Sequence, residues 1–347
     1  MNKENKEGCV FYFFNESIEK PKKQIQKQKI HKIVKIDFFL ENELTNQKKI
    51  NKINNRKNNY YLCENSKELK ITNIDEDSRK IKGQHIIKDN TILLEFEDRQ
   101  IINLKPYLKE LNSSTKYLLT IINFYKHLLN SINLLVNNNI FHNHINFDSI
   151  VVDKFEYPLL TNFSFSIDCS RNDIFQYIKH FIITYEPTYL EWPIELHILS
   201  YLLSNNLNSL SSNNIENIIH DVIKNNIILN TFGDNVVSSF REECLQYFKK
   251  YVNQSYEYIL TDILQYSHTW DNYALSILFL RMLIGIHRTI KIKNKFIILF
   301  MKLLVYNIHL NPSKRNTIDL TITKFDTLLD SLEPKDYKNI INCLMFS

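Results

Sequence analysis

The stretch FHNHINFDSIVVDKFEYPLLTNFSFS, residues 141–166, decides how the fold of this chain is interpreted. It opens with a His-Asn-His triplet at 142–144, and an Asn-Phe-Ser triplet follows at 162–164. Eighteen residues separate His144 from Asn162, and a hydrophobic frame fills most of the interval. Neither triplet contains a carboxylate, so any chemistry centred on them has to work without acidic groups.

This stretch resembles the catalytic core of protein kinases. In that family His-Arg-Asp-Leu-Lys-x-x-Asn is followed by Asp-Phe-Gly, eighteen positions after the first Asp. The same register here keeps His142 but places His144 at the first Asp, Asn146 at the Lys, Ser149 at the closing Asn and Asn162 at the second Asp. The resemblance therefore implies a kinase-like fold in which the chemical groups have been replaced.

Three more segments match the family in the same order along the chain. Residues 192–195 (WPIE) resemble the Ala-Pro-Glu that closes an activation segment, and residues 271–275 (DNYAL) resemble the opening of the central helix of the large lobe. Residues 311–315 (NPSKR) resemble the Asp-Pro-x-x-Arg near the end of the fold. An apolar stripe over residues 118–136 predicts a long amphipathic helix before the first triplet.

Together these segments predict an α+β, two-lobed protein-kinase-like fold. A small, β-rich N-terminal lobe would span residues 1–98, and a large, mainly helical C-terminal lobe would span residues 99–347. In the small lobe, residues 91–97 (TILLEFE) form a β-branched and aromatic run that predicts a strand.

Candidates for nucleotide binding in the small lobe are few. Residues 33–36 (IVKI) resemble the strand that carries the phosphate-binding lysine, which would be Lys35, with Glu43 as its helix partner. The interval of eight residues is short for this pairing, so Glu41 is an equal candidate. An equally weighted interpretation makes Lys35 one more solvated lysine of a lysine-rich segment.

The glycine content argues against a phosphate-binding loop of the usual kind. The chain has only four glycines, and the N-terminal region where such a loop belongs has one, in residues 8–14 (GCVFYFF). Several glycines are needed there so that backbone N–H groups can approach phosphate oxygens. ATP and Mg²⁺ are therefore not expected as cofactors, and any ATP binding would rely on the adenine pocket.

An insertion separates two of the matching segments. Glu195 and Asp271 lie 76 positions apart, where a typical kinase has about a dozen. The insertion, residues 196–268, has helical patterns at 194–203, 215–226 and 240–263, and an Asn/Ser-rich segment at 204–214 that predicts a loop. Two interpretations stay open: the helices pack on the large lobe as structure, or they form a docking surface for a protein partner.

The replaced groups determine what chemistry remains. Mg²⁺ requires hard oxygen ligands, and neutral Ser149 and Asn162 are poor substitutes for metal-binding groups. His144 could accept a proton at neutral pH. Each lost group that removes about 3 kcal/mol of transition-state stabilisation lowers the rate about a hundredfold. Asp148 and Asp168 are the alternatives for a relocated metal ligand.

Four residues keep architectural roles by the resemblance. His142 would brace the catalytic loop, and Asp271 would accept hydrogen bonds from backbone N–H groups of residues 142–144. Glu195 and Arg315 would form a buried ion pair. The family's Arg is replaced by Asn143, which implies no control by phosphate on the activation segment.

These observations predict a pseudokinase that acts as a protein-binding or scaffolding module. The alternative is an atypical active Ser/Thr kinase that uses ATP, or a relative acting on small molecules. An inert structural component, for instance of a viral particle, is a third interpretation. The chain is similar to the kinase-like proteins of large DNA viruses of protists in residues 163–167 and in WPIELH. Its heavy use of Asn, Lys and Ile is typical of an AT-rich genome, and a parasite with such a genome is the alternative source.

Composition excludes several other classes. Five scattered cysteines give neither a disulfide framework nor a CxxC metal motif, so a reducing compartment and no metal site are expected. The net charge of +5 is mild, and its excess at residues 20–57 is typical of a solvated face, so a nucleic-acid partner is not expected. The apolar runs at 275–284 and 296–306 are broken by Arg or Lys and predict buried helices rather than membrane spans. We therefore expect a cytoplasmic protein, in host cytoplasm or virion if the chain is viral.

Overall fold

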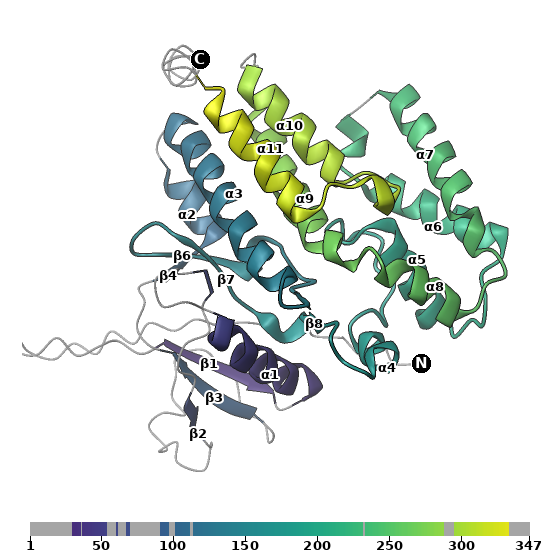
Figure 1. The fold of residues 1–347 in the computed structure, drawn as a ribbon, viewed down its shortest axis with the longest axis horizontal. Helices are drawn as coiled ribbons and strands as arrows, with labels where there is room; N and C mark the ends of the chain where they lie inside the picture. The colour runs from purple at the N-terminus through teal and green to yellow at the C-terminus, as the bar shows by residue number, and fades with distance from the viewer. Residues whose placement is uncertain are drawn as a thin grey trace, which may run out of the picture.

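The computed structural model describes residues 30–35, 37–53, 60–61, 67–69, 91–96, 101–111, 114–231, 233–287 and 295–332. The described part is an α+β structure in which helices predominate and the strands form small sheets (Figure 1). Within these residues, no helix combines the length and the apolar character that a membrane crossing requires.

The first sheet is antiparallel and lies next to one helix. It is formed by β1 (Ile30–Lys35), β2 (Lys67–Leu69) and β3 (Thr91–Phe96), with β3 in the centre. The predicted strand at 91–97 is therefore confirmed. Helix α1 (Phe38–Ile53) follows β1 almost directly and lies beside this sheet (Figure 1).

Two further small sheets lie around the decisive stretch. One has the order β4 (Ile101–Asn103), β6 (Ile150–Asp153) and β7 (Pro158–Leu160), and the other pairs β5 (Ile140–Phe141) with β8 (Ile167–Asp168). Asp153 closes the β6–β7 turn by accepting hydrogen bonds from the backbone N–H groups of Phe155 and Tyr157, both at 2.9 Å. Helix α2 (Leu104–Glu110) continues from β4.

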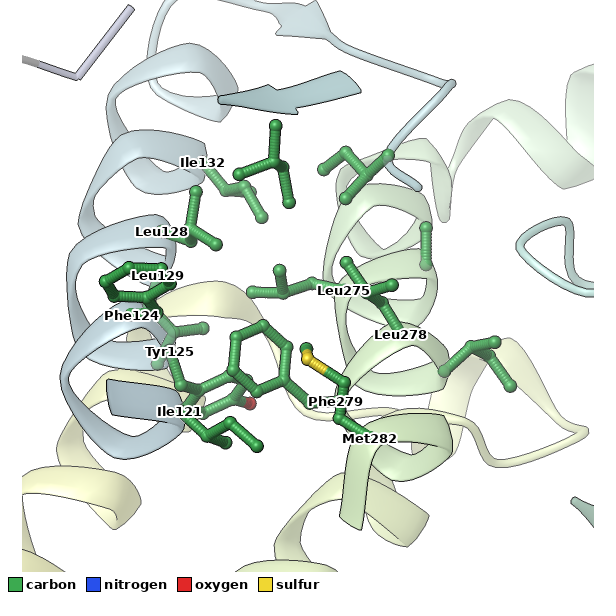
Figure 2. Packing of buried hydrophobic residues seen from close by; sticks show 14 of the residues in the cluster. Ile121, Phe124, Tyr125, Leu128, Leu129, Ile132, Leu275, Leu278, Phe279 and Met282 are labelled. Atoms are coloured by element: carbon green, nitrogen blue, oxygen red, sulfur yellow. The ribbon is translucent and has the colours of Figure 1, made fainter. Parts of the chain in front are cut away.

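Four helices build the main core. They are α3 (Ser114–Val136), α9 (Trp270–His287), α10 (Lys295–Asn307) and α11 (Ile318–Asp330). The apolar stripe of α3 faces α9, so that Leu128 and Ile132 point toward Leu275 (Figure 2). The ring of Tyr125 lies 4.9 Å from Phe279, Phe300 and Phe325, which come from three different helices. The predicted long helix is confirmed, and so are helices at 275–284 and 296–306. Helix α9 is almost wholly buried as predicted, but α10 exposes one face with Ile298, Val305 and Tyr306.

The inserted segment forms a second helical group. Helices α5 (Ile194–Ser204), α6 (Ser212–Asn225), α7 (Asp234–Phe248) and α8 (Tyr256–Leu264) gather on the far side of α9 from α2 and α3 (Figure 1). They share a hydrophobic core of their own, to which α4 (Ile174–Tyr177) also contributes. The helices predicted at 194–203 and 215–226 are confirmed.

Two predictions for the insertion are wrong in detail. The pattern at 240–263 is not one helix, because the chain leaves α7 through a 3-10 turn and Asn253 adopts φ 57° before Ser255 caps α8. The Asn/Ser-rich segment at 204–214 is only in part a loop. Ser211 and Asn214 form a reciprocal cap at the start of α6. Leu210, which directly precedes this cap, is fully buried.

Short 3-10 helices connect these elements. Their bounds are η3 (Phe147–Ser149), η4 (Phe163–Phe165), η5 (Ile178–His180), η6 (Leu229–Thr231), η7 (Lys249–Tyr251), η8 (Ser267–Thr269) and η9 (Pro312–Lys314). Asparagine supplies most of the left-handed positions that such turns need. Five of the six non-glycine residues with positive φ in the described part are Asn, including Asn143 and Asn162. Because Asn tolerates this conformation better than other side chains, a chain with four glycines can still turn tightly.

Candidate functional site

Asp271, in the first turn of α9, anchors the chain where it leaves β5. Its carboxylate accepts hydrogen bonds from the backbone N–H groups of His142 at 2.7 Å and Asn143 at 2.8 Å. Burial raises the pKa of Asp271 to about 6, although the two hydrogen bonds oppose the shift. The contact that the sequence predicts between Asp271 and the 142–144 turn is therefore present.

His142 links the two triplets. Its ring packs edge-on against Phe163 at 4.9 Å, and its Nε2 lies 3.0 Å from the carbonyl oxygen of Thr161 and donates to it. Burial lowers the pKa of His142 to about 3, so the ring is neutral at physiological pH. A neutral, fully buried ring in this position braces the turn and offers nothing to solvent.

The ring of His144 is held between two aromatic rings. Phe165 stacks on it at 4.7 Å and Tyr189 at 5.6 Å. Burial lowers its pKa to about 4, so the ring does not carry a charge at neutral pH. The phenol oxygen of Tyr189 lies 2.8 Å from Nδ1.

Asn146 determines which nitrogen of His144 carries the proton. Its amide oxygen accepts from the backbone N–H groups of Asp148 at 2.8 Å and Ser149 at 3.1 Å, which turns Nδ2 toward His144. Nδ2 lies 3.1 Å from Nε2 of His144 and donates to it. Nδ1 therefore carries the proton and donates to Tyr189. Both ring nitrogens are used inside the protein, and no lone pair is left for a substrate.

The two positions that would hold a metal are engaged in local hydrogen bonds. The Ser149 hydroxyl accepts from the backbone N–H of Asn146 at 2.9 Å and donates to its carbonyl at 3.1 Å. Asn162, in the left-handed conformation with φ 66°, accepts from the Ser164 hydroxyl at 2.7 Å. Among the described residues, no three His, Cys, Asp or Glu side chains are placed to hold a metal ion.

Asp168, one of the two alternative metal ligands, forms an ion pair. It is buried in β8 and pairs with Lys49 of α1. It also accepts hydrogen bonds from the backbone N–H of Ser170 at 3.1 Å and from its hydroxyl at 2.5 Å. Burial by itself raises the pKa of Asp168, but the bonds from Lys49 and Ser170 outweigh it and the pKa is lowered. The other alternative, Asp148, is exposed.

Amide side chains attach α1 to the segment after Asn162, an arrangement that the sequence interpretation missed. Nδ2 of Asn42 donates to the carbonyls of Ser164 at 2.8 Å and Ser166 at 2.9 Å, and Nδ2 of Asn46 donates to Ser166 at 3.1 Å. Tyr177 donates to the Asn42 amide oxygen. The signal was available as two asparagines four residues apart, which share one helix face. Polar residues at that spacing are usually exposed, however.

The two carboxylates considered as lysine partners lie on different faces of α1. Glu43 is buried and accepts from the side chain of Gln47 at 3.4 Å, whereas Glu41 is exposed. Glu43 is therefore the candidate on the inner face. Lys35 ends β1, but its side chain lies outside the described residues, as does the glycine-poor segment 8–14.

Glu195 and Arg315 form the buried ion pair that the resemblance implies, and the structure shows that it is bidentate. The two N–O distances are 2.5 and 2.9 Å, and both side chains are almost fully buried. Nε of Arg315 also donates to the carbonyl of His309 at 2.8 Å. The start of α5 is thereby tied to the segment before α11, 120 residues away in sequence.

Asn143 has no polar partner for its side chain in the described part. Both amide atoms are buried, and the residue adopts φ 57°. Its backbone is engaged on both sides, because the N–H donates to Asp271 at 2.8 Å and the carbonyl accepts from the indole N–H of Trp192 at 3.3 Å. An uncharged, enclosed amide cannot bind a phosphate group as an exposed arginine does.

The site combines the neutral rings of His142 and His144 with the side-chain amides of Asn146 and Asn162, which are hydrogen-bonded within the protein. Its two buried carboxylates, Asp168 and Asp271, are already bonded to Lys49 and to backbone N–H groups. No family model matches this sequence, and a search of curated proteins finds no similar one.

Proposed function

We propose that this chain is a two-lobed protein-kinase-like domain that does not transfer phosphate and acts as a binding module for other proteins. One observation carries the proposal: both ring nitrogens of His144 are bonded to Asn146 and Tyr189. A general base must reach the proton that it removes with a free lone pair. His144 has none unless these internal bonds break.

The kinase-like fold is supported by contacts between segments far apart in sequence. The resemblance implies that Asp271 holds the 142–144 turn and that Glu195 pairs with Arg315, and both contacts are present. Random similarity of short motifs gives no reason for four such segments to meet. In this proposal, β1, β3 and α1 belong to the small lobe, and Glu43 is the buried one of the two candidate carboxylates of α1.

Loss of catalysis is supported by the state of three of the four candidate metal ligands. Ser149 and Asn162 are neutral and engaged locally, and Asp168 is paired with Lys49. Mg²⁺ binding to phosphates needs at least one available carboxylate. Asp148 alone is exposed and would have to serve as the whole metal site.

A thermal-shift titration with ATP tests the proposal, with Mg²⁺, with Mn²⁺ and with EDTA. Saturation of a site at a hundred times its Kd stabilises the folded state by about 2.7 kcal/mol, which raises Tm by several degrees in a domain of ordinary size. We expect no rise in Tm that depends on the metal. A rise that requires Mg²⁺ or Mn²⁺ would show a working metal–nucleotide site and contradict the proposal.

A further inference from the structure

An open pocket with a volume of about 380 Å³ lies in the inserted segment. It is bounded by η5, by the end of α5 with the loop that follows, and by the first turn of α8. Helices α5 and α8 belong to the helical group on the far side of α9 from α2 and α3 (Figure 1). Leu203 and Leu207 contribute a small apolar part to a lining that is mostly polar, and Asn206 and Asn208 line the pocket with them. These residues have no part in the site around His144.

Hydrogen bonds hold the loop that forms this pocket in place. The backbone N–H of Leu207 donates to the carbonyl of Leu202 at 3.0 Å, and that of Asn253 donates to the carbonyl of Leu210 at 2.8 Å. The side chain of Leu210 is fully buried beneath the loop. A ligand would therefore meet a largely preformed surface and would not have to order the loop on binding.

Two residues of opposite charge line the pocket without forming an ion pair with each other. The amine of Lys179 lies 4.7 Å from the centre of the Tyr256 ring, and in the described part of the chain it has no carboxylate within ion-pair distance. Glu257 lines the same pocket and has no cationic partner among these residues either. Lys179 is half-buried, so a carboxylate placed there would be better shielded from solvent than on an open surface.

We propose that this pocket binds a short peptide segment of a partner protein, in which a leucine-like side chain lies next to one Asp or Glu. The apolar side chain would pack on Leu203 and Leu207, and the carboxylate would pair with Lys179. The amides of Asn206 and Asn208 suit a peptide main chain, because each has both a donor and an acceptor. Glu257 disfavours a phosphate dianion and a second acidic residue through like-charge repulsion.

This inference rests on the proposed function as a binding module, and it names the class of partner and the place where it binds. The test uses the full chain and pools of fluorescein-labelled, end-capped heptapeptides, read by fluorescence polarisation. The fourth and fifth positions are fixed as Leu-Asp, Leu-Lys, Ser-Asp or Leu-phosphoserine, and every other position is varied. We expect the Leu-Asp pool to bind most tightly.

Two variants and one control locate the binding. Lys179→Glu should weaken binding of the Leu-Asp pool about tenfold by reversing the charge, and Leu207→Ser should weaken it several-fold. The matched control is Lys224→Glu on α6, an exposed lysine of the same insertion outside the pocket, which should leave the affinity unchanged. Circular dichroism of each variant checks that the helices remain folded.

The inference is overturned if no pool binds, if the Leu-Lys or phosphoserine pool binds more tightly, or if Lys179→Glu and Lys224→Glu behave alike. These outcomes are separate from a failure of the proposed function, which a phosphotransfer assay detects. An active enzyme could still use this pocket for a substrate peptide. A scaffold without peptide binding here would dock its partner on another surface.

Discussion

Asn146 holds the ring of His144 in one protonation state, because its amide oxygen is already used by two backbone N–H groups. The amide nitrogen must then face the ring, and only a ring nitrogen without a proton can accept from it. A single side chain thus caps a 3-10 turn and also consumes the lone pair that a base at this position would need.

Replacing Asn146 by Asp tests this assignment. An aspartate keeps the cap, because its carboxylate accepts the same backbone hydrogen bonds, but it can only accept from His144. We expect the proton to move to Nε2, and the pKa of His144 to rise from about 4 toward its ordinary value of 6.5 beside the new negative charge. Nitrogen-15 NMR of the imidazole during a pH titration reports both changes.

The exposed residue Asn137 offers the control for that experiment. Asn137→Asp makes the same chemical change at the end of α3 and away from the ring, so the tautomer and the pKa of His144 should not move. If Asn146→Asp also left both unchanged, the hydrogen bond from Asn146 would not be what holds the ring.

At the residue scale, the sequence predicted the contacts that family resemblance implies and missed those that belong to this chain. Glu195–Arg315 and the anchoring role of Asp271 could be stated in advance, because their partners stand at matching motif positions. The pair Lys49–Asp168 could not be stated in advance. The region around Lys49 contains several lysines, and only the orientation of α1 decides which of them reaches Asp168.

At the scale of elements, α1 is fixed to η4 by polar side chains as well as by packing. Its buried face contains Asn42, Glu43, Asn46 and Gln47, and its first turn adds the rings of Phe38 and Phe39 against Phe181. Buried amides hold two elements in one relative position strictly, because a shift leaves donors and carbonyls unsatisfied. Helix α1 is therefore expected to stay in place whether or not a ligand is present.

Substituting Asn42 by Ala tests this attachment. The change removes both hydrogen bonds to the carbonyls of Ser164 and Ser166, and the buried Ser164 carbonyl loses its amide donor. The expected loss of unfolding free energy is about 2–3 kcal/mol. Amide hydrogen exchange should also speed up in η4. Chemical denaturation and mass-resolved exchange measure the two effects.

Thr45 provides the comparison, because it lies on the exposed face of the same helix. Thr45→Ala is expected to change stability by less than about 0.5 kcal/mol and to leave exchange in η4 unaltered. Equal effects from the two substitutions would mean that α1 contributes through its helical propensity rather than through its amides.

Predictability from sequence also varied among the elements. Long helices with a strong apolar period, α3 above all, were predicted because periodicity over many residues averages out local exceptions. The break between α7 and α8 was not predicted. It depends on the left-handed conformation of Asn253, and asparagine is so common in this chain that one Asn gives no signal of a turn. The burial of Leu210 could not be predicted either, because a single apolar residue in a run of Asn and Ser forms no periodic pattern.

At the scale of the whole molecule, buried histidines make stability depend on pH. Burial lowers the pKa of His142 to about 3 and the pKa values of His144 and His197 to about 4. The unfolded chain therefore binds these protons between pH 6.5 and about 4, and the folded chain does not. Burial raises the pKa of Asp271 to about 6, which acts in the opposite direction below that pH.

For His142, His144, His197 and Asp271 taken together, the unfolded state binds about two protons more than the folded state at pH 5. The free energy of unfolding should then fall by about 2.7 kcal/mol for each unit of decreasing pH near pH 5. Urea denaturation at pH 7, 6 and 5 measures this slope.

His197, whose two ring nitrogens have no hydrogen-bond partner in the described structure, supplies the decisive variant. The backbone of Tyr189 and Trp192 offsets its pKa shift in part, without reaching hydrogen-bonding geometry.

His197→Leu removes one group that takes up a proton in the unfolded state but not in the folded state, and it also removes one buried polar side chain. We expect the slope to decrease by about 1.4 kcal/mol per pH unit, and stability at pH 7 to rise by about 1 kcal/mol. A stability that stays constant from pH 7 to pH 5, or a slope that the variant leaves unchanged, would show that these imidazoles are not buried in neutral form.

The central claim is that the geometry around His144 does not support phosphoryl transfer. The direct test incubates the purified full chain with γ-labelled ATP and Mg²⁺ or Mn²⁺, alone and with casein and myelin basic protein as acceptors. The wild type and His144→Ala are assayed side by side. We predict that neither incorporates label above the buffer blank. Label transfer by the wild type that His144→Ala abolishes would contradict the account and identify His144 as a working base.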